Sequence, residues 1–349
     1  MYEYYRIVDA NINRAAEGIR VCEDYARFVK NEKELSSTCK ILRHKIRSLP
    51  EEVVEKCLLG RDSSNDVGCE ISRTTKIDDR RKTAEFVAAN CKRAQEALRA
   101  TEETLKILGY YEVAKTYEEI RFSCYSLEKK LFSKRNHCID IIKQADIYGI
   151  TAEELSNGRG NIEVVRHMLN AGIRVVQYRE KEKSMLEKYQ QCREIRRMTK
   201  ECGAVFIVDD DVDLALCCGA DGVHIGQDDL PIEEVRKIAG DMVVGLSTHS
   251  PEQARDAVLR RADYIGVGPI FKTHTKKNVC APVGLSYLEY VVNNINLPFV
   301  AIGGIKEHNL GEVIAHGAKC VCLVSEITGA SDIEETIKRL KDKISGGIK

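Results

Sequence analysis

The residues best suited to chemistry lie at or just after the ends of short apolar runs in the second half of the chain. In chain order these positions hold Thr151, then Gln177, Arg179 and Lys181, then Asp209, Asp210 and Asp211, then Gln227, Asp228 and Asp229, then Ser247, Thr248 and His249, then Gly268, then Gly303 and Gly304, and finally Ser325. A single charged residue after a strand is usually just a solvated loop residue. Many polar residues at strand ends that share one rim indicate a functional site. The glycine pair lets backbone N–H groups approach an anion, so it indicates a phosphorylated ligand.

The elements that carry these residues follow a βα alternation. From Ile139 onward, short apolar runs alternate with amphipathic helical stretches, which is the pattern of a parallel sheet. The runs are Ala145–Ile150, Arg174–Tyr178, Ala204–Val208, Gly222–Ile225, Val243–Leu246, Tyr264–Val267, Phe299–Ile302 and Cys320–Val324. Eight strands in about 200 residues favour a compact (β/α)8 TIM barrel, whose chemistry lies at the carboxyl ends of the strands.

The first half of the chain has a different period. From Tyr2 to about Phe132 the apolar residues recur at helical spacing, interrupted by a turn-forming stretch from Gly60 to Gly68. At 349 residues the chain has room for two domains. We therefore predict an α/β protein in which an all-helical domain over residues 1–135 precedes a TIM barrel over residues 139–349.

The composition excludes several classes of partner. The 54 basic and 54 acidic residues give a net charge of zero, so no global field attracts nucleic acid or an anionic membrane. The apolar runs are far shorter than the ~20 residues of a membrane span, and the N-terminus lacks a signal-peptide core. The 14 cysteines form no CxxC pair, which favours reduced, mostly buried thiols. We expect a cytoplasmic protein with small-molecule partners and leave room for a homo-oligomer.

Four segments resemble the motifs of thiamine phosphate synthase in order and spacing. They are Val176–Lys181, Asp210–Ala215, Ala220–Asp229 and Gly268–Lys276. The resemblance implies a transferase that uses Mg²⁺ to condense a hydroxymethylpyrimidine diphosphate with thiazole phosphate, giving thiamine phosphate and pyrophosphate. Such a reaction needs no protein nucleophile. It needs electrostatic stabilisation of the departing pyrophosphate and the positioning of two rings.

The resemblance also implies roles for individual residues. Asp210 and Asp229 would be the Mg²⁺ carboxylates. The catalytic side chains would be Gln177, Ser247 and Lys276. The other substrate contacts would be Arg179, Lys181, Asp209, Thr273, Thr275, Gly304, Val324 and Ser325. Among these, the basic residues would meet the pyrophosphate, and the last three would hold the thiazole phosphate.

One position departs from the family pattern. Asp209 stands where the family usually has Asn, which places another acidic group beside the expected metal. It either weakens pyrophosphate binding by repulsion or attracts Mg²⁺ more strongly. Two other functions stay open for the barrel: a thiazole tautomerase, and a non-catalytic sensor of thiamine intermediates. Neither would need the complete set of pyrophosphate and metal residues, so their presence favours the synthase.

A repeat runs through the helical half. The pattern of Asn11, Arg14, Glu17 and Arg20 recurs as Asn90, Arg93, Glu96 and Arg99. Three-residue spacing places each set on one helix face. The two sets form either solvated stripes of ion pairs or, as we predict, one polar site between two packed helices.

This half also resembles the helical domain fused to some thiamine phosphate synthases. The resemblance rests on the opening from Asp9 to Arg20 and on the loop from Arg61 to Gly68. The family name associates the domain with phosphorylation of hydroxymethylpyrimidine phosphate, but the chain has no GxxxxGK[ST] loop. A kinase-like, a substrate-handling and a dimerising role all stay open. The candidate site comprises Arg14, Glu17, Arg20, Arg61, Arg93, Glu96 and Arg99.

Overall fold

Two units make up the chain, and each has a hydrophobic core of its own. The computed structural model describes residues 2–61, 83–273, 275 and 280–346. The first unit is Met1–Ser133 and the second is Lys134–Lys349. A boundary at residue 139, as expected from the sequence, would fall inside the helix that opens the second unit, α7 (Lys134–Gln144).

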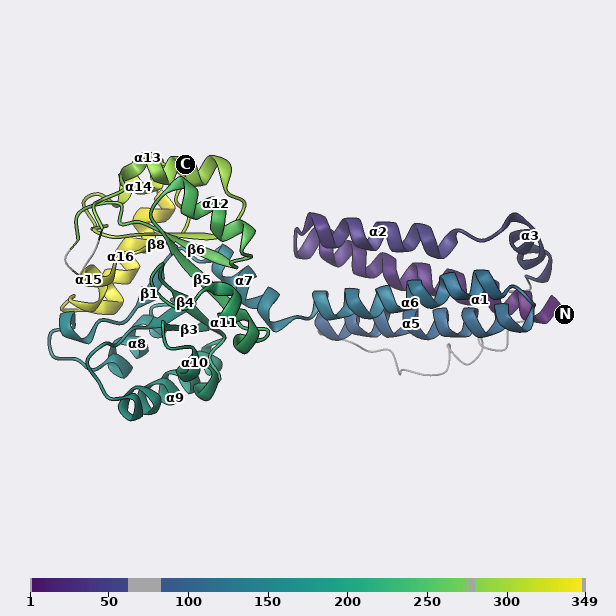
Figure 1. The fold of residues 1–349 in the computed structure, drawn as a ribbon, viewed down its shortest axis with the longest axis horizontal. Helices are drawn as coiled ribbons and strands as arrows, with labels where there is room; N and C mark the ends of the chain where they lie inside the picture. The colour runs from purple at the N-terminus through teal and green to yellow at the C-terminus, as the bar shows by residue number, and fades with distance from the viewer. Residues whose placement is uncertain (1, 62–82, 274, 276–279, 347–349) are drawn as a thin grey trace. The chain divides into compact units, whose positions relative to one another are not determined.

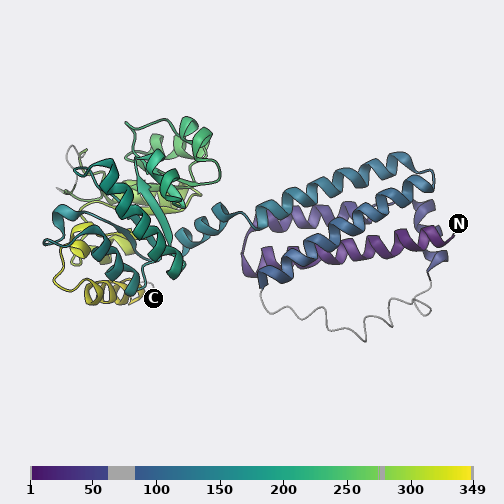
Figure 2. The same cartoon turned by 90° about the horizontal axis from the view of Figure 1, so that it is seen from below.

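The described part of the first unit is helical. It contains α1 (Tyr2–Asp24), a π-helical turn η1 (Tyr25–Val29), α2 (Lys33–Arg47), α3 (Glu51–Gly60), α5 (Thr83–Ile107) and α6 (Tyr111–Leu131). The long helices lie side by side (Figures 1 and 2), with α1 against α5, α2 and α3, and α6 against α5 and α2. Each buries the apolar stripe that the helical spacing predicts.

The second unit alternates strands with helices. Its strands are β1 (Tyr148–Ile150), β2 (Val175–Tyr178), β3 (Val205–Asp209), β4 (Gly222–Ile225), β5 (Val243–Thr248), β6 (Tyr264–Val267), β7 (Phe299–Ile302) and β8 (Val321–Cys322). After α7 come the 3-10 turn η2 (Glu153–Leu155) and the helices α8 (Asn161–Asn170), α9 (Met185–Cys202), α10 (Val212–Cys218), α11 (Ile232–Ala239), α12 (Pro251–Leu259), α13 (Gly284–Asn294), α14 (Leu310–Ala315), α15 (Val324–Thr328) and α16 (Ile333–Gly346).

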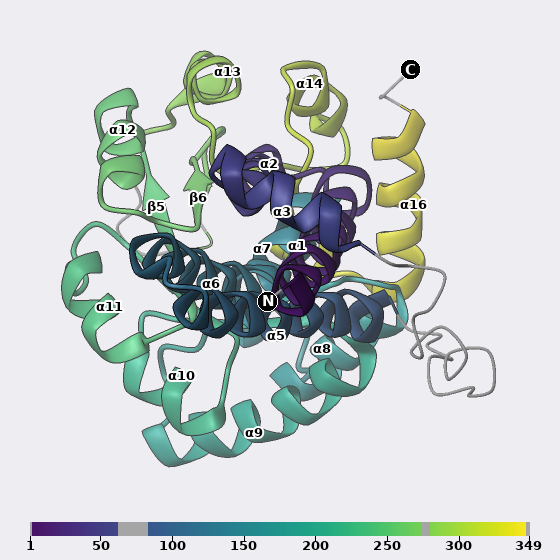
Figure 3. The same cartoon turned by 90° about the vertical axis from the view of Figure 1, so that its right-hand side faces the viewer.

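The eight strands form one parallel sheet in the order β1 to β8. A parallel bridge between Ile147 and Val321 joins its two edges, and the outer helices surround it as a ring (Figure 3). The predicted TIM barrel is therefore confirmed. No helix in the described part of the chain is long and apolar enough to cross a membrane.

Strand alternation decides which side chains face the barrel interior. In β2, Val176 and Tyr178 pack under the outer helices, whereas Val175 belongs to the inner core. Gln177, two residues after Val175, therefore lies on the inner face near the carboxyl end of its strand. In β3, Ile207 belongs to the inner core, so Asp209, two residues later at the end of the strand, lies on the same inner face. Polar side chains from separate strands thus meet at one mouth.

Helix α7 packs against the inner core, and the sequence alone did not predict it. Its Cys138, Ile141 and Ile142 are buried in the same cluster as the inward side chains of the barrel. At the start of α7, Arg135 Nη2 lies 2.6 Å from Asp263 Oδ1, and Lys134 Nζ lies 2.9 Å from Asp221 Oδ1. The helix is therefore an integral part of the barrel unit.

We predict that Ile142→Ala lowers the stability of the barrel. Ile142 is 1% exposed, so its truncation leaves a cavity and costs roughly 2–5 kcal/mol in the free energy of unfolding. Urea unfolding followed by circular dichroism would measure the loss. Ile238→Ala, at an exposed position on α11, is the matched control and should stay within about 0.5 kcal/mol of wild type. Equal losses in the two variants would contradict a role for α7 in the barrel core.

Candidate active site

A cavity of about 430 Å³ opens at the carboxyl ends of the strands. Its lining includes most of the residues expected from the sequence: Gln177, Arg179, Asp209, Ser247, Thr273, Thr275, Gly304, Val324 and Ser325. These residues come from at least six strand ends or following loops, so only the closed barrel brings them together. Lys276 lies outside the described residues.

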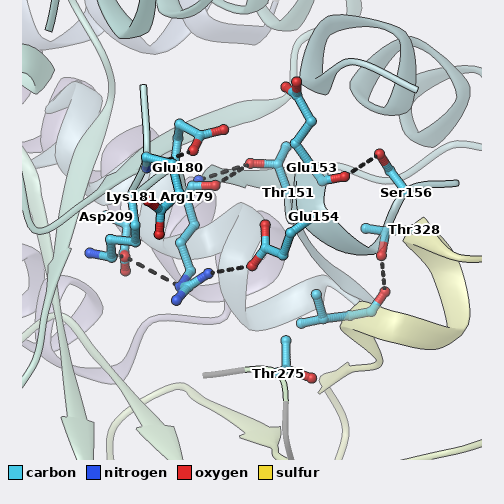
Figure 4. Close-up of polar contacts among 12 residues, drawn as sticks. Thr151, Glu153, Glu154, Ser156, Arg179, Glu180, Lys181, Asp209, Thr275 and Thr328 are labelled. Atoms are coloured by element: carbon cyan, nitrogen blue, oxygen red, sulfur yellow. Dashed lines mark hydrogen bonds and ion pairs between the residues drawn. The ribbon is translucent and has the colours of Figure 1, made fainter. Parts of the chain in front are cut away.

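Basic side chains face carboxylates at this mouth. Lys181 Nζ lies 3.1 Å from Asp209 Oδ2 and also contacts Asp210 Oδ2. The Arg179 guanidinium lies between two carboxylates (Figure 4), with Nε 3.8 Å from Asp209 Oδ2 and Nη1 3.3 Å from Glu154 Oε1. The backbone of Arg179 is held by Thr151, whose hydroxyl accepts from its N–H at 2.9 Å and donates to its C=O at 3.1 Å. The two cations are therefore positioned by the ends of β1, β2 and β3.

One carboxyl of the mouth, Asp209, has a raised pKa. Burial, reinforced by the adjacent charge of Asp210, raises the pKa of Asp209 to about 6 although Lys181 opposes the change. The Gln177 amide donates to Asp209 Oδ1 at 3.2 Å. The side chain that departs from the family pattern is thus linked to three of the expected substrate contacts, namely Gln177, Arg179 and Lys181.

The two expected metal ligands lie close to each other. Burial raises the pKa of Asp229, and the nearby Asp210 carboxyl adds to the effect. The Gly226 N–H donates to Asp229 Oδ2 at 2.7 Å, which fixes the orientation of this carboxylate. Mg²⁺ is usually held by one or two carboxylates together with water and substrate phosphate oxygens. The chemistry of this pair of side chains therefore fits the ion.

A glycine cradle follows β7 on another side of the cavity. Gly303 and Gly304 have φ values of +98° and +65°, a region that favours glycine. A Cβ at Gly303 would lie 2.4 Å from Pro269 Cβ, and one at Gly304 would lie 2.6 Å from the Lys272 carbonyl oxygen. Only glycine fits at these two positions. Because glycine has no side chain, a phosphate can approach the backbone N–H groups closely.

The sequence missed several residues that line the cavity. Lys306 is one: its Nζ donates to Ser325 Oγ at 2.8 Å and lies 2.9 Å from Glu326 Oε1. Its position two residues after the glycine pair was the available signal. The others include Tyr148, His224 and Tyr264. The strand pattern made these aromatic and imidazole side chains look like ordinary core residues.

The charged repeat of the helical unit has a different environment from the one predicted. The contact between α1 and α5 is made by small and apolar side chains, and a Cβ at Gly18 would lie 2.7 Å from the Asn90 carbonyl oxygen. Arg14, Glu17, Arg20, Glu96 and Arg99 are exposed, and Arg93 is half-buried. The helices approach too closely for these long side chains to fit between them, so the predicted enclosed position is wrong.

Ion pairs account for much of the repeat. Arg20 and Arg99 each pair with acidic residues of their own helix, Asp24 and Glu103 at 3.1 Å. Glu23 and Glu102, which correspond in the repeat, are buried. Each meets an arginine of another helix: Arg43 Nε at 3.0 Å and Arg121 Nη2 at 3.0 Å. Arg61, the remaining candidate, makes two bonds to Asp9, at 2.8 Å and 2.6 Å.

Comparisons with known proteins agree with this division of the chain. Residues 147–327 match the thiamine monophosphate synthase family, and residues 6–130 match the ThiD2 family. The thiamine-phosphate synthase of Pelotomaculum thermopropionicum is 64% identical over 203 residues, which are 58% of this chain and 93% of the relative. That of Synechocystis is 35% identical over 341 residues, covering 97% of this chain and 96% of the relative. The solved thiamine phosphate pyrophosphorylase of Pyrococcus furiosus is 33% identical with a TM-score of 0.55, covering 60% of this chain and all 100% of that one.

The raised pKa of Asp209 predicts a pH-dependent stability. Its ordinary pKa is 3.8 and its folded value is about 6, so the folded protein binds this proton more tightly than the unfolded chain does. The stabilising contribution is present below about pH 3.8 and is lost as the pH rises through about 6. Asn cannot ionise. The thermal midpoint of Asp209→Asn should therefore rise relative to wild type between about pH 4 and pH 7.

Thermal unfolding in a series of buffers would test this. Asp228→Asn removes an exposed carboxylate of the same rim and controls for the change in net charge. A difference between Asp209→Asn and wild type that stays constant across the pH range would contradict the perturbed ionisation of Asp209.

Proposed function

We infer the role of each site residue from one premise: the chain belongs to the thiamine monophosphate synthase family. Its barrel is a transferase that condenses hydroxymethylpyrimidine diphosphate with thiazole phosphate to give thiamine phosphate and pyrophosphate. The tautomerase and sensor alternatives find no support among the relatives.

The observation that carries the proposed roles is the concentration of cations and carboxylates at the ends of β2 and β3, where Lys181 contacts both Asp209 and Asp210. In the reaction, the bond between the pyrimidine methylene carbon and the diphosphate oxygen breaks, and its electron pair leaves with pyrophosphate. The thiazole nitrogen then forms a bond to the same carbon. Because negative charge grows on the leaving group, fixed cations stabilise the transition state more than the ground state.

Arg179 and Lys181 would bind the pyrophosphate, with Lys276 as a third cation. Arg179 offers a planar fork of donors and Lys181 a compact charge, which together suit a polyanion. Without substrate these cations are balanced by Asp209, Asp210 and Glu154. When the substrate binds, phosphate oxygens would replace some of these carboxylates. Because Asp209 would compete with the pyrophosphate for the two cations, it would weaken pyrophosphate binding.

Asp210 and Asp229 would hold Mg²⁺. When bound, the ion would neutralise charge on the pyrophosphate oxygens. Asp229 is already oriented by the Gly226 N–H, so this chain contributes one preorganised ligand.

The remaining residues would position the two rings. Gln177 and Ser247 would contact the aminopyrimidine, because an amide and a hydroxyl can match its donors and acceptors. Gly304, Val324 and Ser325 would hold the thiazole phosphate at the glycine cradle. Thr273 and Thr275, whose hydroxyls lie 3.3 Å apart, would contact the substrates from the loop after β6.

For the helical unit we propose substrate handling. Arg20 and Arg99 occupy equivalent positions of the repeat and are exposed, so each can exchange an acidic neighbour for a phosphate oxygen. Arg14, Glu17, Arg93, Glu96 and Arg61 would shape the surface around them. The ligand proposed for this surface is a pyrimidine phosphate.

We predict that Asp210→Asn and Asp229→Asn each lower turnover by about a hundred-fold or more at ordinary Mg²⁺ concentrations, because each removes a charged oxygen ligand. The assay is the formation of thiamine phosphate at increasing Mg²⁺. Asp228→Asn is the matched control, since it removes the neighbouring carboxylate, and should keep near-normal turnover. Normal Mg²⁺ saturation in both ligand variants would contradict the proposed metal site.

We also predict that the intact chain binds a pyrimidine phosphate at the helical unit. In calorimetric titration, the Arg20→Ala, Arg99→Ala double variant should lose one binding event per chain, because two phosphate-binding charges are gone. The control is Arg27→Ala, Arg47→Ala, which removes the same charge from exposed positions of the same unit. Identical titrations for wild type and both double variants would leave the repeat as a stripe of ion pairs.

A further inference from the structure

A chain of hydroxyl and imidazole groups crosses the interior of the barrel. Tyr148 Oη lies 2.7 Å from Tyr264 Oη, which lies 3.0 Å from His224 Nδ1. On the other side of the imidazole ring, His224 Nε2 lies 3.0 Å from Ser247 Oγ. The four side chains come from β1, β6, β4 and β5, and all of them line the cavity. The proposed function assigns a role only to Ser247.

The barrel makes room for this chain of groups at a specific position. A Cβ at Gly245 would lie 2.2 Å from Tyr264 Cζ and 2.5 Å from His224 Nδ1, so β5 cannot carry a side chain there. The rings of His224 and Tyr264 consequently pack with their centroids 5.4 Å apart. Tyr148 and Tyr264 are 2% and 1% exposed, and burial raises the pKa of both, which keeps each hydroxyl protonated.

The number of hydrogens available determines which group donates in each of these three hydrogen bonds. Each phenol has one hydrogen to donate. Among the described residues, the Tyr148 hydroxyl has its hydrogen bond to Tyr264, whereas Tyr264 also reaches His224. Both hydrogens are used within the barrel only if Tyr148 donates to Tyr264 and Tyr264 donates to Nδ1. A neutral imidazole that accepts at Nδ1 carries its hydrogen on Nε2, and so donates to Ser247 Oγ.

We propose that Tyr148, Tyr264 and His224 are positioning residues that fix Ser247 as a hydrogen-bond donor toward the substrates. With its oxygen engaged by the His224 N–H, Ser247 directs its own hydrogen to a lone pair of the bound ligand. If the donor and acceptor roles were reversed, Ser247 would donate its hydrogen to His224 Nε2 and would have none to donate to the ligand. This inference rests on the proposed contact between Ser247 and the substrates, and it adds the means by which the barrel sets the direction of that contact.

A double-mutant cycle on the intact protein tests the coupling. Tyr264→Phe keeps the ring and removes the hydroxyl, and we expect it to lower kcat by about ten-fold through misorientation of Ser247. In a Ser247→Ala background the same substitution should change kcat by less than about two-fold, because the group it orients is gone. The control is Tyr287→Phe, which removes another buried hydroxyl, 2.7 Å from Thr248 Oγ1, and should leave kcat near wild type.

Two kinetic outcomes would overturn the inference in distinguishable ways. Fully additive losses for Tyr264→Phe and Ser247→Ala would show that Tyr264 does not act through Ser247, while leaving the proposed role of Ser247 intact. Unchanged turnover in Ser247→Ala alone would remove the proposed role of Ser247 and this inference with it.

A spectroscopic measurement covers the case in which Tyr264→Phe fails to fold. In the wild-type protein labelled with ¹⁵N-histidine, at about pH 8 where histidine is ordinarily neutral, the His224 signals should be those of the tautomer protonated at Nε2. The His224→Asn variant would identify these signals by their loss. A tautomer protonated at Nδ1 would overturn the proposed direction.

Discussion

The space inside a small closed barrel is the constraint on which the rest of this structure depends. The bridge between Ile147 and Val321 closes the sheet, so inward side chains from all eight strands share one interior. Two tyrosines and a histidine enter it, and the rings of Tyr264 and His224 occupy the space that a side chain at Gly245 would need. A Cβ at Gly222 would likewise lie 2.4 Å from the Val243 carbonyl oxygen. Glycines on the strands therefore leave the space that neighbouring groups fill in the barrel interior. The apolar layer that packs against α7 fills the rest of this core.

Charge at the mouth follows from the same closure. Parallel strands end at one rim, so residues far apart in sequence, such as Lys181 and Asp209, become neighbours at 3.1 Å. Partial burial makes each charge depend on its partners, which is why Asp209, beside Asp210, has a raised pKa even with a lysine in contact. This arrangement suits a polyanionic substrate, because the cations are already in place and only their partners must change.

In the helical unit, the repeat is as much a packing device as a surface pattern. The close approach of α1 and α5 at Gly18 leaves long side chains on the outside. The buried Glu23 and Glu102 need a partner, and each finds an arginine from a neighbouring helix. Part of the similarity between the two halves of the repeat is thus explained by equivalent ion pairs, and the exposed arginines are the part that packing does not explain.

The sequence by itself determined the fold class and predicted a set of residues that the structure brings together at the barrel mouth. Period-two and helical patterns located the strands, and a motif such as Val176–Lys181 identified the family because its residue types and spacing are local properties. Tertiary structure decided what depends on contacts between distant strands. The role of α7 was hidden because its start read as a basic linker, although Arg135 pairs with Asp263. His224 looked like a core residue until its ring nitrogens were placed between Tyr264 and Ser247. The three-residue spacing of the repeat placed each set of charged residues on one face of its own helix. It did not predict that these faces are exposed, because the distance between two packed helices depends on the side chains of both.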